Sequence, residues 1–244
     1  MSLLDKKFGY TLSEVLITIT LIGFLATMTL STVGSSVQQR TRLAEFRAAY
    51  SKMSTALKNI MADTGRIYAC YSTPTSSEIT NFGLKMDGTA TAASGACKEI
   101  EAAFVRSIGA VRFCESDPFT EGCLPANYTP GEAGCFTNFS NSKAYVLDNS
   151  MIFITDTKTS SLKQFAVDVN GRKGPNKWGQ DIFPFSLKAT ETQTVHGKVF
   201  VKSVGILPPD SSCKYYVDAT IPLKDRPNRT TGEMMKESAG IKLN

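Results

Sequence analysis

The sequence is poor in the side chains that most catalytic and metal centres need. It has one histidine, His196, among 244 residues, and none of its six cysteines forms a C-x-x-C pair. A Ser-His-Asp triad, a His-rich metal site or a zinc site would be hard to assemble from this set. The net charge of +5 is spread along the chain and forms no basic stripe of the kind that binds nucleic acid. We therefore expect no enzyme, and nothing in the sequence indicates a nucleic-acid partner.

Charge is also missing from one long stretch near the start. No residue from Val15 to Gln39, a span of 25, is charged. About 20 apolar residues suffice for a helix to cross a bilayer, and Lys6 and Lys7 before the run would keep the N-terminus in the cytoplasm. A secretory signal peptide would be shorter and would end in a small-x-small cleavage site. A signal peptide and a plain signal anchor both leave Glu14 unexplained, because a carboxylate in hydrocarbon is costly unless it has a partner.

The segment KKFGYTLSEVLITITLIG, residues 6–23, places Gly9, Tyr10, Thr11, Leu12 and Glu14 at fixed spacing before the apolar run. It resembles the N-terminus of type IV pilins and type II secretion pseudopilins. The family pattern is a short basic leader, a glycine, a hydrophobic residue, Thr, Leu, any residue and Glu, and Tyr10 stands where most members have Phe. The resemblance implies cleavage after Gly9 by prepilin peptidase, N-methylation of Tyr10, and retention of the apolar segment on the mature protein.

The resemblance also implies a role for Glu14, because the equivalent glutamate of the family is needed for assembly. Cleavage would expose an α-amino group on Tyr10. In a stack of staggered helices, Glu14 of one copy can pair with that amine on its neighbour. The charge of Glu14 is costly in apolar surroundings when it is unpaired, so the pairing would fix the register between subunits.

The helix is predicted to continue beyond the apolar run. Apolar side chains recur at steps of 3, 4, 3, 4 and 3 at Leu43, Phe46, Tyr50, Met53, Leu57 and Ile60. This spacing places them on one helical face. We predict a helix from Thr11 to Asp63, with residues 10–39 as the transmembrane and assembly half and residues 40–63 as an amphipathic half. A coiled coil with a partner is the alternative to packing on the chain's own sheet, which we favour because a domain follows directly.

Residues 64–244 are predicted to form a globular domain outside the cytoplasm. The patterns indicate an irregular connection at residues 70–97, a short helix at 97–109, and a hairpin at 143–155 that turns at 148–150. Three further strands are predicted at residues 162–170, 198–207 and 214–222. The expected fold class is therefore α+β. In its finer form the expectation is a pilin-like fold, with the long N-terminal helix packed on an antiparallel sheet in a domain that contains disulfides.

All the cysteines lie beyond the predicted helix, at Cys70, Cys97, Cys114, Cys123, Cys135 and Cys213. An even number in an exported domain indicates up to three disulfides, although free thiols remain the alternative. Fifteen pairings are possible for six cysteines. We favour Cys114 with Cys123, because the segment CESDPFTEGC between them contains turn residues.

The stretch VDVNGRKGPNKWGQDIFPF, residues 167–185, holds oxygen-bearing side chains around glycines. Asp168, Asn170 and Asp181 are candidate ligands for calcium, with Asn176 beside them, and some pseudopilins hold calcium in a loop of the globular domain. The spacing does not match an EF-hand. The alternative, which we favour, is a glycine-rich loop between strands in which Asn and Asp side chains accept nearby N–H groups. We expect no other cofactor.

Together these features predict a structural subunit of a type IV pilus-like filament. The precursor would lie in the bacterial inner membrane as a single-pass protein, and the assembled filament would be at the cell surface or in the periplasm. The expected partners are further copies of the chain or other pilins, prepilin peptidase and the inner-membrane assembly machinery. A type II secretion pseudopilin, and a minor or competence pilin that acts in adhesion or DNA binding, are the alternatives.

We predict that the precursor is cut between Gly9 and Tyr10, because the basic leader and the YTLSE spacing place the scissile bond there. N-terminal sequencing of protein extracted from membranes tests this, and Tyr10 should be the first residue. A mature end beyond Val37 would instead identify an ordinary signal peptide and contradict the family resemblance.

Overall fold

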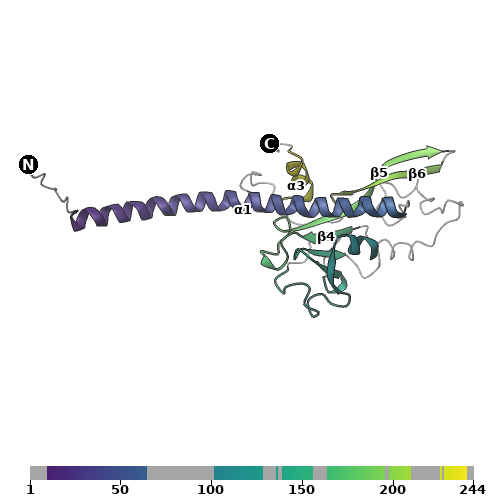
Figure 1. The fold of residues 1–244 in the computed structure, drawn as a ribbon, viewed down its shortest axis with the longest axis horizontal. Coiled ribbons are helices and arrows are strands. Elements are labelled where there is room, and N and C mark those ends of the chain that lie inside the picture. Colours follow the sequence, from purple (N-terminus) through teal and green to yellow (C-terminus); the bar gives the residue numbers. More distant parts are fainter. Residues whose placement is uncertain are drawn as a thin grey trace, which may run out of the picture. The chain divides into compact units, whose positions relative to one another are not determined.

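The computed structural model of the chain describes residues 10–64, 102–128, 136, 139–155, 164–195, 198–209, 226 and 228–240, without the side chains of residues 29–36, 64, 189 and 191–203. It divides the chain into two compact units, Met1–Thr41 and Arg42–Asn244. Helix α1 (Leu12–Thr64) contributes to both units (Figure 1). Among the described residues, no helix combines the length and the apolar character needed to cross a membrane.

In the second unit, α1 buries the predicted apolar stripe. Phe46, Met53, Leu57 and Ile60 are buried, while Leu43 and Tyr50 are partly buried and pack against the same core. Ala49 and Ala56 lie on this face too and bring the helix backbone close to its neighbours. The core they join contains side chains from the sheet of the same chain, so the predicted packing on the chain's own sheet is confirmed.

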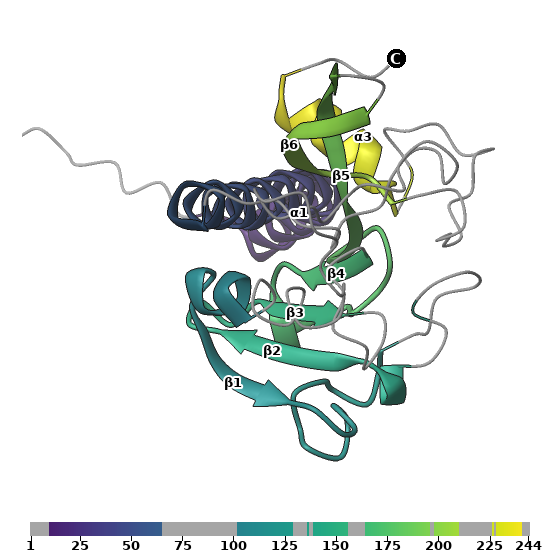
Figure 2. The same cartoon turned by 90° about the vertical axis from the view of Figure 1, so that its right-hand side faces the viewer.

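The sheet is a six-stranded antiparallel meander in which chain order is also spatial order (Figures 1 and 2). Its strands are β1 (Ala110–Cys114), β2 (Lys143–Leu147), β3 (Ile152–Thr155), β4 (Gln164–Asp168), β5 (Ile182–Val195) and β6 (Lys198–Leu207). Two short 3-10 turns, η1 (Phe139–Asn141) and η2 (Gly171–Lys173), lie in the connections. The α+β class with an antiparallel sheet is therefore confirmed.

Both faces of the sheet are covered, and side chains alternate between them along each strand. Phe153, Phe183 and Phe185 face the layer that contains α1 and the helical residues 102–107. Ile152 and Ile154 face the opposite layer, where the core is filled mainly by aromatic side chains from the connections: Tyr128, Phe136, Phe139 and Trp178. Because both faces are buried, β3 has four buried residues in succession instead of an apolar and polar alternation.

Several predicted elements are confirmed. The hairpin turns between β2 and β3 at residues 148–150, where Ser150 takes a left-handed φ of 69°. Strand β6 matches the prediction for 198–207, β4 lies within 162–170, and the helical residues 102–107 lie within 97–109. The predicted strand 214–222 and the connection 70–97 lie outside the described residues.

The predicted loop, residues 167–185, is longer than the observed one. Strand β4 ends at Asp168 and β5 begins at Ile182, so the connection is residues 169–181. Strand β5 was not predicted from the sequence, and Pro184 interrupts its apolar run, where a proline usually argues against an inner strand. Here Pro184 lies opposite Ala166 of β4, within a continuous register from Gln164 to Asp168.

Strand β1 and helix α3 (Thr231–Ser238) were not predicted from the sequence either. Thr230 caps α3 and forms a reciprocal capping box with Glu233. The helix is fixed to the sheet because Thr231 Oγ1 donates to the carbonyl of Pro184 at 2.7 Å and Met234 is buried in the core beside α1.

We predict that Phe46→Ala lowers the free energy of unfolding by about 3–5 kcal/mol, the usual cost of removing a buried ring. Phe46 is fully buried, and its ring centroid lies 4.9 Å from that of Phe183 and 5.8 Å from that of Phe185. Urea unfolding followed by the fluorescence of Trp178, the only tryptophan, measures the effect.

Phe113→Ala is the matched control, because Phe113 is 45% exposed and stacks only on Tyr145 among the aromatic pairs of the described residues. It should cost less than about 1.5 kcal/mol. Equal losses at the two positions would show that the α1 stripe is not the core of the domain.

Candidate functional site

The first unit exposes an apolar helix surface on every side. We call residues 12–28 of α1 the apolar segment, and every side chain in it is exposed. Its large apolar side chains are Leu12, Val15, Leu16, Ile17, Ile19, Leu21, Ile22, Phe24, Leu25 and Met28. Consecutive apolar residues point in directions about 100° apart on a helix, so a run of this kind leaves no polar face. A helix that is hydrophobic all round is normally buried in a membrane or among other helices.

The hydroxyl groups of the apolar segment are satisfied within the helix. Thr18 donates to the carbonyl of Val15 at 2.9 Å, Thr20 to that of Ile17 at 2.8 Å, and Thr27 to that of Phe24 at 2.8 Å. These bonds leave no threonine donor of this segment in need of water. The segment can therefore enter apolar surroundings without leaving these donors unpaired.

The carboxylate of Glu14 belongs to a capping box at the start of α1. Thr11 is the N-cap, because its carbonyl accepts the first helical bond, from Val15 N at 3.2 Å. Glu14 N donates to Thr11 Oγ1 at 3.3 Å, and Glu14 Oε2 accepts from Thr11 N at 2.9 Å. Thr11 Oγ1 also donates to Glu14 Oε2 at 2.9 Å. The charge thus has a partner inside its own chain, and it lies at the helix end whose dipole favours a negative charge.

The predicted processing and assembly residues lie next to this capping box. Tyr10 directly precedes Thr11 and is 84% exposed, whereas Gly9 lies outside the described residues. Helix α1 begins at Leu12, so Tyr10 and Thr11 precede its first turn. The sequence analysis identified Glu14 but not Thr11 as its partner, although T-x-x-E before an apolar run is a signature of a capping box.

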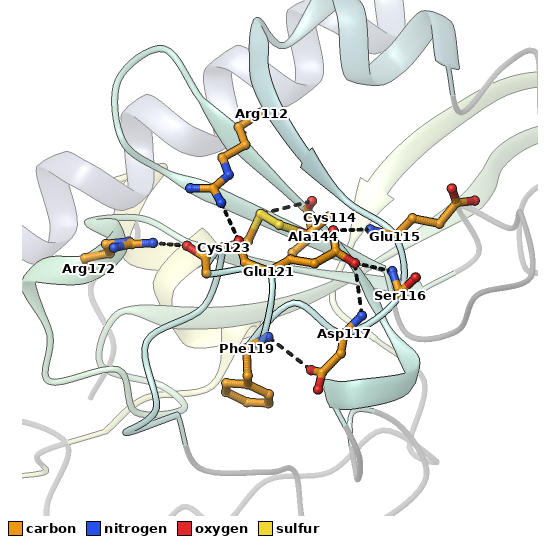
Figure 3. Close-up of a disulfide and its surroundings, with 11 residues drawn as sticks. Arg112, Cys114, Glu115, Ser116, Asp117, Phe119, Glu121, Cys123, Ala144 and Arg172 are labelled. Atoms are coloured by element: carbon orange, nitrogen blue, oxygen red, sulfur yellow. Dashed lines mark hydrogen bonds between the residues drawn. A yellow bond between two sulfur atoms is a disulfide. The ribbon is translucent and has the colours of Figure 1, made fainter.

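The structure joins Cys114 to Cys123, the pair that the sequence favoured, and so closes a loop of sequence separation 9 at the end of β1 (Figure 3). The carboxylate of Glu121 bridges this loop, because it accepts the N–H groups of Glu115 at 3.2 Å, Ser116 at 2.7 Å and Asp117 at 3.2 Å. These hydrogen bonds lower the pKa of Glu121, the bond from Ser116 most.

Two arginines support the same loop from outside it. Arg112 on β1 donates to the carbonyl of Glu121, and Arg172 from η2 donates to that of Gly122 (Figure 3). The other candidate disulfide residues, Cys70, Cys97, Cys135 and Cys213, lie outside the described residues. Their oxidation remains a prediction.

The connection 169–181 is held at both ends by buried aspartates. Asp168 Oδ1 accepts the N–H groups of Asn170 at 3.1 Å and Gly171 at 2.7 Å, while Oδ2 accepts from the hydroxyl of Tyr128. Asp181 accepts the N–H groups of Asn176 and Lys177, both at 2.7 Å. Gly171 is required here: its φ is +64°, and a Cβ would lie 2.0 Å from the carbonyl oxygen of Ser150.

The oxygens of the candidate calcium ligands fall into two groups. Asp168 and Asp181 accept hydrogen bonds from protein donors, and the described residues contain no group of three acidic, histidine or cysteine side chains that could hold a metal. Asn170 donates its amide to the carbonyl of Gly174 at 3.1 Å, whereas the side-chain oxygens of Asn170 and Asn176 are buried without a hydrogen-bond partner. The arrangement matches the favoured alternative, a loop closed by Asx-type hydrogen bonds, and calcium binding remains an untested prediction.

Burial controls the acid chemistry of this connection. It raises the pKa of Asp168 to about 7, against the hydrogen bond from Tyr128, and the nearby Asp181 raises it further. Burial likewise raises the pKa of Asp181, although the N–H groups of Asn176 and Lys177 and the charge of Arg42 oppose the shift. The pKa of Tyr128 is raised by burial first and then by Asp168. Near neutral pH, Tyr128 therefore keeps its proton and donates it in a hydrogen bond to Asp168, which is itself partly protonated.

Comparison with known proteins gives no match to a protein-family model, to a curated protein or to a solved structure. Function therefore has to be inferred from the residues of this chain.

We predict that the domain loses stability as the pH rises from about 4 to 7, and that Asp168→Asn removes part of this slope. The folded-state pKa of Asp168 is raised from 3.8 to about 7, so the folded state binds the proton more tightly in that range. The stabilisation is complete below the unfolded pKa and is lost as the pH passes through the folded one. The loss should be on the order of 3 kcal/mol.

Urea unfolding at several pH values, with Trp178 fluorescence as the signal, tests this prediction. The slopes of the parent and of Asp168→Asn are compared, because acids distant from Asp168 contribute equally to both. The difference between the slopes therefore reports Asp168 together with its coupling to Asp181. Identical slopes would contradict a buried Asp168 with a raised pKa.

Proposed function

We propose that this chain is a structural subunit of a type IV pilus-like filament, processed by prepilin peptidase and polymerised through its N-terminal helix. The observation that carries the proposal is the apolar segment of α1, which exposes large apolar side chains on all sides. A surface of this kind needs a covering, because leaving it in water costs about 25 cal/mol for each Å² of apolar area. Lipid covers it before assembly and the apolar segments of other copies cover it in the filament.

The uncharged run from Val15 to Gln39 supports the membrane-bound stage of this proposal. It is long enough to cross a bilayer as a helix, and the threonines of the apolar segment are already bonded to helix carbonyls. The precursor would be a single-pass protein of the bacterial inner membrane, with its globular domain outside the cytoplasm. Assembly would move it into a filament at the surface or in the periplasm.

The position of Tyr10 supports processing between Gly9 and Tyr10. Tyr10 and Thr11 lie before the first helical residue, and a peptide bond outside a helix is accessible to a peptidase without local unfolding. Cleavage there would create a new α-amino group on Tyr10, which is three residues before Ser13 and four residues before Glu14. Glu14 is the nearest acidic side chain that follows in the sequence.

Assembly would then depend on the pairing of Glu14 with the Tyr10 amine of a neighbouring copy. Leaving either charge without its partner in apolar surroundings is costly, even where the ion pair itself adds little net stability. This makes the pairing selective for one stagger between subunits. A secretion pseudopilin would use the same contact in a periplasmic piston, so it remains the alternative together with a minor or competence pilin.

We predict that Glu14→Gln leaves cleavage and membrane insertion intact and reduces the yield of filaments at least tenfold, because the residue loses its charge but can still accept the capping hydrogen bond. Membrane-fraction abundance and sheared filaments are measured in the same cells. Glu115→Gln is the matched control: the same change is made at an exposed glutamate of the globular domain, and filament yield should match that of the parent. Normal filaments from Glu14→Gln would rule out the pairing.

A further inference from the structure

Glu14 uses its two carboxylate oxygens unequally. Oε2 accepts both the backbone N–H and the hydroxyl of Thr11, each at 2.9 Å. Oε1 has no hydrogen-bond partner among the described residues. One oxygen therefore fixes the carboxylate to the start of its own helix, and the other keeps its capacity to accept a donor.

The hydroxyl of Thr11 has no remaining freedom in this arrangement. Its single proton goes to Glu14 Oε2, so in the 3.1 Å contact with Ser13 Oγ the donor is Ser13. Its oxygen also accepts the N–H of Glu14 at 3.3 Å. The Thr11 hydroxyl is thus fixed by Ser13 and Glu14, and it in turn holds the Glu14 carboxylate in one rotamer. Fixing a flexible side chain in advance lowers the entropy cost of its later contact.

From this geometry we infer that Thr11 is a positioning residue for assembly, which holds Oε2 of Glu14 so that Oε1 is presented to the amine of a neighbouring copy. The inference rests on the proposed function, because it needs that neighbour. It assigns a different role to each carboxylate oxygen of Glu14, which the sequence motif does not do. Thr11 donates to Oε2 within the same chain, and these hydrogen bonds also satisfy part of the carboxylate while the subunit is alone in lipid.

A purely structural role for Thr11 predicts a different pattern of effects. An N-cap stabilises the first turn whatever the charge at position 14, because Gln completes a capping box as well as Glu does. A positioning role acts only through the carboxylate. The effect of removing the Thr11 hydroxyl should therefore disappear when residue 14 is Gln, which is the logic of a double-mutant cycle.

The experiment measures how well a tagged variant enters filaments of the untagged parent. Full-length variants are coexpressed with the parent, and the tagged fraction in sheared filaments is divided by the cleaved, tagged protein in the membrane fraction. This normalisation removes effects on expression, insertion and processing. Thr11→Val removes the hydroxyl at nearly constant shape, and Thr11→Ser keeps it. Thr120→Val is the matched control, because the Thr120 hydroxyl also donates to a carboxylate three residues away, that of Asp117 at 2.7 Å, but lies in the globular domain.

We expect Thr11→Val to enter filaments about fivefold less well than the parent, the change in an equilibrium constant expected when one flexible side chain is no longer fixed in advance. Thr11→Ser and Thr120→Val should enter like the parent. In the Glu14→Gln background, Thr11→Val should cause no further loss.

Two results would overturn the inference while leaving the proposed function in place. One is parental incorporation of Thr11→Val beside poor incorporation of Glu14→Gln. The other is the same fold-loss from Thr11→Val in both backgrounds, which would reduce Thr11 to a helix cap. Parental incorporation of Glu14→Gln would instead contradict the proposed pairing itself.

Discussion

The packing of the second half of α1 on the sheet is the contact on which the folded domain depends. The helix contributes Phe46 and the apolar residues at three- and four-residue steps after it, and the sheet contributes the rings of Phe183 and Phe185. Neither surface could remain in water, because each exposes several large side chains when separated from the other. This contact fixes which face of each strand points to the helix. The alternate residues must then be covered from the other side, as the aromatic layer around Trp178 does.

Four carboxylates among the described residues accept nearby backbone N–H groups. Glu121 accepts three N–H groups of its own disulfide loop, Asp181 accepts two from the preceding turn, and Glu14 and Glu233 each accept the N–H of an N-cap threonine. Hydrogen bonds to a charged acceptor are stronger than those between neutral groups, so these contacts fix each carboxylate beside its own turn. Each of the four caps or closes that turn, whatever further partner it has.

The same T-x-x-E signature has different consequences in the two units. At α3, Glu233 also accepts from Arg226 at 3.0 Å, so its charge is neutralised within the domain. At α1, Glu14 has only Thr11 as a partner among the described residues, and apolar side chains follow it along the helix. The first arrangement completes a folded domain. In the second arrangement the charge of Glu14 has no cation beside it among the described residues. In the proposed assembly contact, a neighbouring copy of the chain supplies that cation.

Features that depend on short sequence distances could be predicted from the sequence. The helical stripe follows from side-chain periodicity, the β2–β3 hairpin from its turn, and the Cys114–Cys123 pair from a separation of nine residues. A short motif predicts that Tyr10 and Glu14 are the processing and assembly residues, and this stays a prediction. The capping role of Thr11 was equally local and could have been found from its spacing to Glu14.

Contacts between distant segments were decided by the tertiary structure. Pro184 lies inside β5 only because β4 supplies a partner strand, and Asp168 becomes a buried acid only because Tyr128, 40 residues away, covers it and donates to it. Strand pairing and burial depend on which surfaces meet after the chain has folded, and this is not encoded in any single window of residues. The sequence by itself therefore determined the local elements and the apolar segment of α1, while packing decided the limits of the sheet, the second buried layer and the acid chemistry of the connection between β4 and β5.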